Sequence, residues 1–104
     1  MEKRVNKRIE ANQEIIYASD KTKRYGTLVN CSERGMYIKP TISFPVNSVY
    51  EIRIPLKKEL LRIPGRVVRV EKSGECYDGF GLELMKFPKN YLKYLIKLDL
   101  VHES

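Results

Sequence analysis

Short runs of β-branched and aromatic residues recur along this chain, and glycine, proline or polar turn residues separate them. In the clearest run, residues 49–54 read Val-Tyr-Glu-Ile-Arg-Ile, an alternation that gives a strand one wet and one dry face. Several such runs at short spacing indicate an all-β sandwich or a small barrel. We expect strands over residues 14–18, 24–31, 36–39, 49–54, 60–71 and 77–85.

The C-terminal segment follows a helical period instead. Pro88 suits the first turn of a helix, and apolar residues then recur at helical spacing: Tyr91, Leu92, Leu95 and Ile96. We expect a helix over about residues 88–99 that packs on the β domain. Three lysines at i, i+4 and i+8 occupy another face: Lys89, Lys93 and Lys97. We interpret them as a solvated face, and the alternative is a docking surface for an acidic protein or lipid headgroups.

Composition limits the classes of protein to which this chain can belong. Its 104 residues suffice for one domain with one core. Lysine and arginine number 20 against 13 acidic residues, so the formal net charge of +7 favours anionic partners. No apolar run approaches the ~18 residues of a spanning helix, and polar residues follow the basic start where a signal peptide has its apolar segment. We expect a cytoplasmic protein without stable membrane insertion.

The residues that commonly carry catalysis or bind metals are few and scattered. Cys31 and Cys76 form no CxxC pair, and with the single histidine, His102, they cannot supply a Cys/His zinc site by themselves. The carboxylates show no pairing that suggests general acid–base chemistry. We therefore expect no enzyme, no metal site and no cofactor.

The first of two motifs with binding chemistry is Arg4-Val-Asn-Lys-Arg8. An arginine guanidinium can bond phosphate oxygens or the O6/N7 edge of guanine in bidentate fashion, and it can stack on a base. Residues four apart share a face of an extended strand and are neighbours on a helix, so one ligand can contact both arginines. The spacing alone is weak evidence, because Arg62 and Arg66 repeat it inside an expected strand.

The second motif is Asn30-Cys-Ser32-Glu-Arg-Gly35, which occurs once. Strand alternation would put Asn30 and Ser32 on the outer wall, and Val29 and Cys31 in the core. The amide and the hydroxyl can then both donate and accept hydrogen bonds on one face. Gly35 would let a ligand or another backbone approach closely and would supply a positive φ in the turn. An ordinary hairpin turn, whose Asn and Ser bond their own backbone, is the competing interpretation.

Together, the two motifs in a basic β-rich chain resemble the PilZ domain family. Two further segments look like later strands of that family: Ile63-Pro-Gly-Arg-Val-Val-Arg69 and Gly79-Phe-Gly-Leu-Glu-Leu84. The resemblance covers nearly the whole chain, as a single-domain member. It implies a six-stranded antiparallel β-barrel with a C-terminal α-helix packed on it, and a receptor for the bacterial second messenger cyclic di-GMP. We expect a basic N-terminal arm over residues 1–12 and one barrel domain over 13–104.

The resemblance also assigns the ligand site, residue by residue. It implies that Arg4 and Arg8 grip guanine and phosphate, while Asn30, Ser32 and Gly35 line the barrel surface beneath. Three neighbouring basic residues are further candidate contacts: Lys3, Lys7 and Arg34. In the family, the residue before the first arginine is tied to whether one ligand or a stacked pair is held. Here that residue is Lys3, whose charge suits the more highly charged pair.

The function implied by the resemblance is a mechanical signal. Cyclic di-GMP would pull the basic arm onto the barrel, and an unidentified effector protein would read the changed surface. The family's usual outputs are motility, exopolysaccharide and biofilm control. Two alternatives stay open: a protein-interaction barrel without a ligand, and a small barrel that binds RNA or single strands. Binding of RNA or single strands could use four tyrosines: Tyr25, Tyr37, Tyr50 and Tyr77. No segment concentrates them with basic residues, so we expect no DNA or RNA partner.

Overall fold

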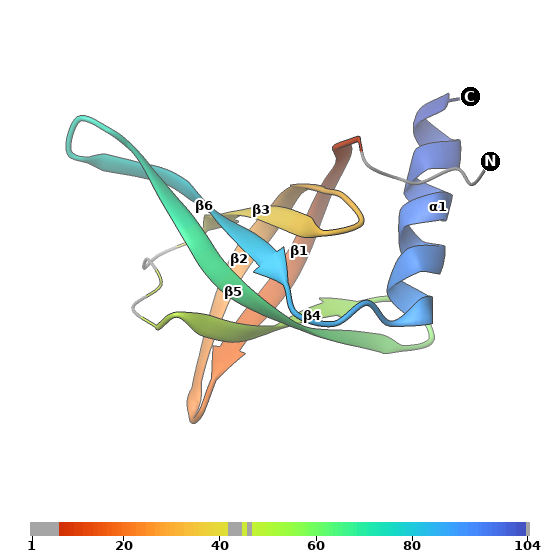
Figure 1. The fold of residues 1–104 in the computed structure, drawn as a ribbon, viewed down its shortest axis with the longest axis horizontal. Coiled ribbons are helices and arrows are strands. Elements are labelled where there is room, and N and C mark those ends of the chain that lie inside the picture. The colour runs from red at the N-terminus through yellow and green to blue at the C-terminus, as the bar shows by residue number, and fades with distance from the viewer. Residues whose placement is uncertain (1–6, 42–44, 46, 104) are drawn as a thin grey trace.

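Six strands close into a barrel, and one helix follows them (Figure 1). The computed structural model describes residues 7–41, 45 and 47–103. Its elements are β1 (Ile9–Ser19), β2 (Thr22–Cys31), β3 (Gly35–Pro40), β4 (Val49–Pro55), β5 (Leu60–Ser73), β6 (Cys76–Leu84) and α1 (Lys89–Glu103). Every neighbouring pair is antiparallel, and the order around the ring is β1-β2-β3-β6-β5-β4. The predicted six-stranded antiparallel barrel with a C-terminal helix is therefore confirmed.

The barrel interior is filled by the apolar side of each strand. In β4 the alternation is regular, because Tyr50, Ile52 and Ile54 are buried while the residues between them face outward. Tyr17 packs edge-to-face against both Tyr50 and Phe80, with ring centroids 5.1 Å apart in each pair. These aromatic rings fix the contact between strands that lie far apart in sequence.

The first strand begins earlier than the sequence predicts. β1 starts at Ile9, five residues before the expected start at residue 14, so residues 9–12 form part of the strand rather than of an arm. A bulge between Glu10 and Gln13, where Asn12 has a φ of 49°, interrupts the alternation. Because of this bulge, the first residues of β1 show no regular alternation in the sequence and look like a polar segment, although Ile9 is buried in the core.

A second bulge changes which residues of β2 point inward. The register of β2 against β3 shifts between Leu28 and Asn30. Cys31 is buried as predicted. The other fully buried apolar residue in this part of β2 is Leu28, whereas Val29 is only half-buried. The prediction that Val29 lies in the core was wrong, because strand alternation does not hold across a bulge.

Helix α1 packs against the barrel mainly through Tyr91, Tyr94 and Leu95, which are buried. The helix extends to Glu103, beyond the expected end near residue 99. Ile96 is 50% exposed, so the prediction that it packs on the barrel was wrong. The three stripe lysines are exposed: Lys89, Lys93 and Lys97. Among the described residues, no helix is long and apolar enough to cross a membrane.

Candidate functional site

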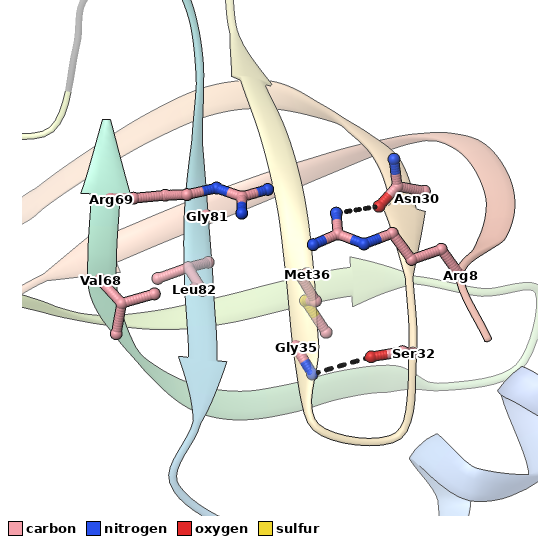
Figure 2. Close-up of a pocket in the computed structure, with 9 residues that line it drawn as sticks. All are labelled: Arg8, Asn30, Ser32, Gly35, Met36, Val68, Arg69, Gly81 and Leu82. Atoms are coloured by element: carbon pink, nitrogen blue, oxygen red, sulfur yellow. Dashed lines mark hydrogen bonds between the residues drawn. The ribbon is translucent and has the colours of Figure 1, made fainter. Parts of the chain in front are cut away.

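A small pocket lies on the outer wall of the barrel, where the start of β1 meets strands β2, β3, β5 and β6 (Figure 2). Its volume is about 80 Å³. The lining residues are Arg8, Asn30, Ser32, Gly35, Met36, Val68, Arg69, Gly81 and Leu82. The structure therefore brings together four residues that the two sequence motifs single out: Arg8, Asn30, Ser32 and Gly35.

Arg8 reaches Asn30 because β1 and β2 are antiparallel. Glu10 pairs with Asn30 in that ladder, so the residue just before β1 lies beside the last residues of β2. The Nη1 group of Arg8 donates a hydrogen bond to Oδ1 of Asn30 at 3.1 Å. A guanidinium carries five N–H groups, so this bond holds the side chain while others can face a ligand.

The turn that follows Asn30 is held by four hydrogen bonds. Two bonds lie within the turn: Ser32 N donates to the backbone oxygen of Gly35 at 2.8 Å, and Gly35 N donates to the side-chain Oγ of Ser32 at 3.2 Å. From outside, the Tyr91 hydroxyl of α1 donates to Ser32 O at 2.6 Å, and Leu84 N donates to Arg34 O at 2.8 Å. The hairpin interpretation thus describes Ser32, whereas Asn30 accepts a hydrogen bond from Arg8, the residue just before β1.

Gly35 serves the site through close packing. The positive φ expected at Gly35 was wrong, since the positive-φ glycine among the described residues is Gly74. A Cβ on Gly35 would lie 2.9 Å from the backbone oxygen of Leu82 in β6. The expected close approach of another backbone is present, because β3 begins at Gly35 and pairs there with β6.

Arg69 is a pocket residue that sequence reasoning missed. Its side chain extends from β5 across Gly81, and Figure 2 shows its guanidinium pointing toward that of Arg8 from the other side of β3. Arg69 Nε lies 3.3 Å from Glu71 Oε2, and the guanidinium carbon lies 5.8 Å from the Tyr37 ring centroid. A bulge between Val67 and Arg69 sets the direction of this side chain, so alternation could not locate it. The available sequence signal was Gly81, the small residue that faces Arg69.

Other predicted contacts lie away from this pocket or outside the described residues. Arg4 and Lys3 are outside the described part of the chain. Lys7 Nζ lies 3.0 Å from Asp99 Oδ1 of α1, and the Arg34 guanidinium lies 5.7 Å from the Phe87 ring centroid. Neither Lys7 nor Arg34 lines the pocket.

The four tyrosines considered for nucleic-acid binding do not form one surface. Tyr50 is buried in the core, and the Tyr37 hydroxyl donates to Glu71 at 3.0 Å. Tyr25 and Tyr77 are 63% and 51% exposed, respectively. The Tyr77 ring lies 4.8 Å from Lys72 Nζ, and Tyr25 is on a different strand, β2.

Cys31 lies behind the polar motif, inside the barrel. Burial raises the pKa of its thiol to about 11, while a hydrogen bond with Tyr91 acts in the opposite direction. The thiol therefore stays protonated near neutral pH, and it packs as a small apolar group rather than as a nucleophile.

These features define a class of protein: a closed antiparallel barrel with a polar, arginine-flanked pocket on its outer wall and a helix packed against it. The family model described as the PilZ domain matches residues 2–98. The chain belongs to the PilZ domain family.

Two solved structures resemble the whole chain. The Bacillus subtilis inhibitor of motility (MotI/DgrA) matches with a TM-score of 0.70 and 16% identity, over 100% of this chain and 55% of that one. The PilZ domain of YcgR from Escherichia coli, solved with c-di-GMP, matches with a TM-score of 0.70 and 10% identity, over 97% and 95% of the two chains. The chain thus spans about half the length of MotI. Comparison with curated proteins gives no significant match. At these identities the likeness shows the shared fold.

Proposed function

We propose that this chain is a receptor for cyclic di-GMP and that the pocket on the outer wall is its binding site. The observation that carries the proposal is the pair of guanidinium groups, Arg8 and Arg69, which point toward each other from opposite sides of β3, with Arg8 hydrogen-bonded to Asn30 (Figure 2). Membership of the PilZ family supports this assignment, and so does the c-di-GMP complex of the YcgR domain.

The chemistry of the pocket suits a guanine nucleotide. Guanine presents O6 and N7 as adjacent acceptors, and each phosphate presents anionic oxygens, so both match the bidentate donors of arginine. Val68, 55% exposed, gives the pocket an apolar surface on which the face of a base can rest. Met36 and Leu82 also line the pocket, but each is only 3% exposed, because their side chains pack in the barrel core.

The size of the pocket supports a role for the N-terminal arm. A volume of about 80 Å³ is well below the roughly 300–1,000 Å³ of pockets that enclose small ligands. A dinucleotide would lie on the wall and would need a cover from elsewhere in the chain. In this proposal the residues before β1 form that cover, with Arg4 as the second arginine of the clamp and with Lys3 and Lys7 adding positive charge.

The energy balance explains why several contacts are needed. Ordering a residue costs about 1–2 kcal/mol, and each charge-assisted hydrogen bond contributes about 1.5–3 kcal/mol. Two arginines with two bonds each would therefore roughly offset the ordering of a short arm. Net affinity would come from stacking, from the Asn30 and Ser32 platform, and from Arg69.

The arm would then carry the signal. Binding of the dinucleotide would bring the basic residues before β1 onto the wall and partly neutralise them, and an effector protein in the cytoplasm would read the changed surface. Motility, exopolysaccharide or biofilm control is the proposed process.

Isothermal titration calorimetry with cyclic di-GMP tests the proposal. We expect the parent to bind, and Arg8→Ala to weaken binding by about tenfold or more, because it removes at least one charge-assisted contact. Arg62→Ala is the matched control: Arg62 belongs to the second pair of arginines four residues apart, is exposed, and lies 3.5 Å from Glu51 outside the pocket. Its affinity should equal that of the parent, and both variants should keep the parent's thermal midpoint.

Two further titrations define the kind of site. Affinity should fall as salt rises, because ionic contacts to phosphate are screened. An excess of an unrelated oligonucleotide should leave binding unchanged. Unaltered affinity in Arg8→Ala would refute the clamp, and displacement by the oligonucleotide would favour a general single-strand-binding barrel.

A further inference from the structure

A groove separate from the nucleotide pocket lies between α1 and the turn that joins β4 to β5. Figure 1 shows this turn beside the first part of α1, and the Asn90 amide of α1 donates to Glu59 Oε1 of the turn at 3.3 Å. The groove has a volume of about 360 Å³, larger than that of the nucleotide pocket. It shares no lining residue with that pocket.

The floor of the groove is apolar. Leu56 of the turn and Leu98 of α1 are half-buried, and Tyr94 of α1 is 7% exposed. Val101 extends this floor toward the end of α1 and is 68% exposed. Side chains of this kind gain free energy when another apolar surface covers them, in proportion to the area removed from water.

The rim of the groove is basic. Lys57 of the turn lies on one side, and Lys93 and Lys97 of α1 lie on the other. Among the described lining residues the one carboxylate is Glu59, which already accepts the hydrogen bond from Asn90. The described carboxylate of α1, Asp99, is paired with Lys7 away from the groove. Lys93 and Lys97 are one helical turn apart and repel each other, so an added anion between them is favourable.

An apolar floor with a basic rim is complementary to one type of protein segment. An amphipathic helix places apolar side chains on one face and can carry carboxylates along both edges of that face. A bilayer would instead contact a convex apolar surface, whereas Leu56, Tyr94 and Leu98 line a concavity. Concavity and charge therefore favour a protein partner over a membrane.

We propose that this groove is a docking site for an acidic amphipathic helix of a partner protein. The apolar residues of that helix lie on Leu56, Tyr94, Leu98 and Val101, and its carboxylates pair with Lys57, Lys93 and Lys97. The groove shares no lining residue with the cyclic di-GMP pocket, so the two sites can be tested separately.

The probe for the test is a synthetic peptide of about 16 residues, with leucines at helical spacing on one face and glutamates beside them. The full chain, isotope-labelled, is titrated with the peptide in the absence of nucleotide. We expect saturable NMR shift changes in residues 56–59 and 90–101, and none at Asn30 or Arg69. A second peptide with lysines in place of the glutamates should not bind.

Charge reversal on the rim separates groove binding from general attraction. The double variant Lys93→Glu/Lys97→Glu should bind the acidic peptide about tenfold or more weakly, because two attractions become repulsions. Lys21→Glu/Lys23→Glu makes the same change of charge at exposed positions of the β1–β2 hairpin and should leave peptide affinity within about twofold of the parent. Val101→Ser, at an exposed position, should weaken binding several-fold.

Three results would overturn the proposal. These are equal peptide affinity in the two charge-reversed proteins, shift changes confined to the nucleotide pocket, and binding of the chain to anionic phospholipid vesicles without binding of the peptide. Cyclic di-GMP affinity is measured on the same Lys93→Glu/Lys97→Glu protein. If the two sites are separate, Lys93→Glu/Lys97→Glu should lose peptide binding and keep nucleotide binding. Arg8→Ala should show the reverse, so a failure of one site can be distinguished from a failure of the other.

Discussion

At the scale of single residues, two tyrosines of α1 differ in whether the side-chain hydroxyl has a hydrogen-bond partner. Tyr91 and Tyr94 stack with ring centroids 6.4 Å apart, and both are buried. The Tyr91 hydroxyl donates to the carbonyl of Ser32 in the turn beneath the pocket. The Tyr94 hydroxyl is buried and has no hydrogen-bond partner among the described residues. A buried polar group without a partner keeps its full desolvation cost, so the two hydroxyls contribute to stability with opposite sign.

Removing each hydroxyl in turn tests this difference. Tyr91→Phe should lower the free energy of unfolding by about 1–2 kcal/mol, because the Ser32 carbonyl loses its partner, whereas Tyr94→Phe should raise it by about 1 kcal/mol. Urea denaturation measures both changes. Tyr91→Phe should also weaken cyclic di-GMP binding, since the turn that carries Ser32 loses an outside support, and Tyr94→Phe should not. Changes of the same sign in the two variants would contradict the assignment.

The sequence motifs predicted Asn30 and Ser32 of the pocket and one of its two arginines, Arg8, but not the other, Arg69. Arg8, Asn30 and Ser32 meet as expected because the spacing of the two motifs matches the register between β1 and β2. Arg69 and Arg34 could not be distinguished in this way. Arg34 lies within the second motif and Arg69 lies far from both motifs in sequence, yet Arg69 lines the pocket while Arg34 lies over Phe87. The neighbours that decide this, Gly81 and Phe87, come from other parts of the chain.

At the scale of elements, the strands were predictable and their bulges were not. Alternation located β4 to within one residue at its end, since each of its core positions carries a bulky apolar side chain. The bulges in β1, β2 and β5 depend on the register of the paired strand, which alternation within one strand does not contain. The bulge in β5 nevertheless decides where Arg69 points.

Gly81→Ala tests whether the packing of β5 on β6 positions the site. A Cβ on Gly81 would lie 3.0 Å from Arg69 Nε and 3.1 Å from Arg69 Cγ, atoms of a flexible side chain that can move. We expect a thermal midpoint close to that of the parent and a several-fold loss of cyclic di-GMP affinity, because the guanidinium is displaced.

Gly35→Ala is the contrasting variant. Its Cβ would meet a backbone oxygen of β6 at 2.9 Å, so β3 and β6 must separate, at a cost of about 1–3 kcal/mol of stability. If Gly81→Ala bound the nucleotide like the parent in calorimetry, Arg69 would not contribute to the site.

At the scale of the whole molecule, barrel closure is the feature least accessible to local patterns. β1 pairs with β4 and β3 pairs with β6, and these contacts join segments that are far apart along the chain. The count of strands and the helical period of the C-terminal segment could be read from alternation and spacing. Closure into a barrel was implied by the resemblance to a known family, and the order of the strands around the ring was not predicted, because no local run specifies its distant partner.

Buried titratable groups between α1 and the barrel make the stability of the whole domain depend on pH. Burial raises the pKa of Cys31 from 9.0 to about 11 and that of Tyr94 from 10.0 to about 12, and it raises the pKa of Tyr91 as well. The native state therefore keeps protons that the unfolded chain has already released. This contribution to stability is complete below about pH 9, and it is lost as the pH rises from there through the native pKa values.

Guanidinium denaturation at about pH 8 and about pH 11 measures this loss, and we expect the stability of the parent to be much lower at the higher pH. Cys31→Ala should lower stability at both values, because it leaves a small cavity in the core. The difference between the two pH values should nevertheless be smaller in Cys31→Ala than in the parent, since one of the groups with a raised pKa is gone. Cys76→Ala, which removes the exposed thiol, is the control for the loss of a cysteine. Equal pH dependence in the parent and Cys31→Ala would mean that the buried thiol behind the outer-wall pocket titrates as it does in the unfolded chain.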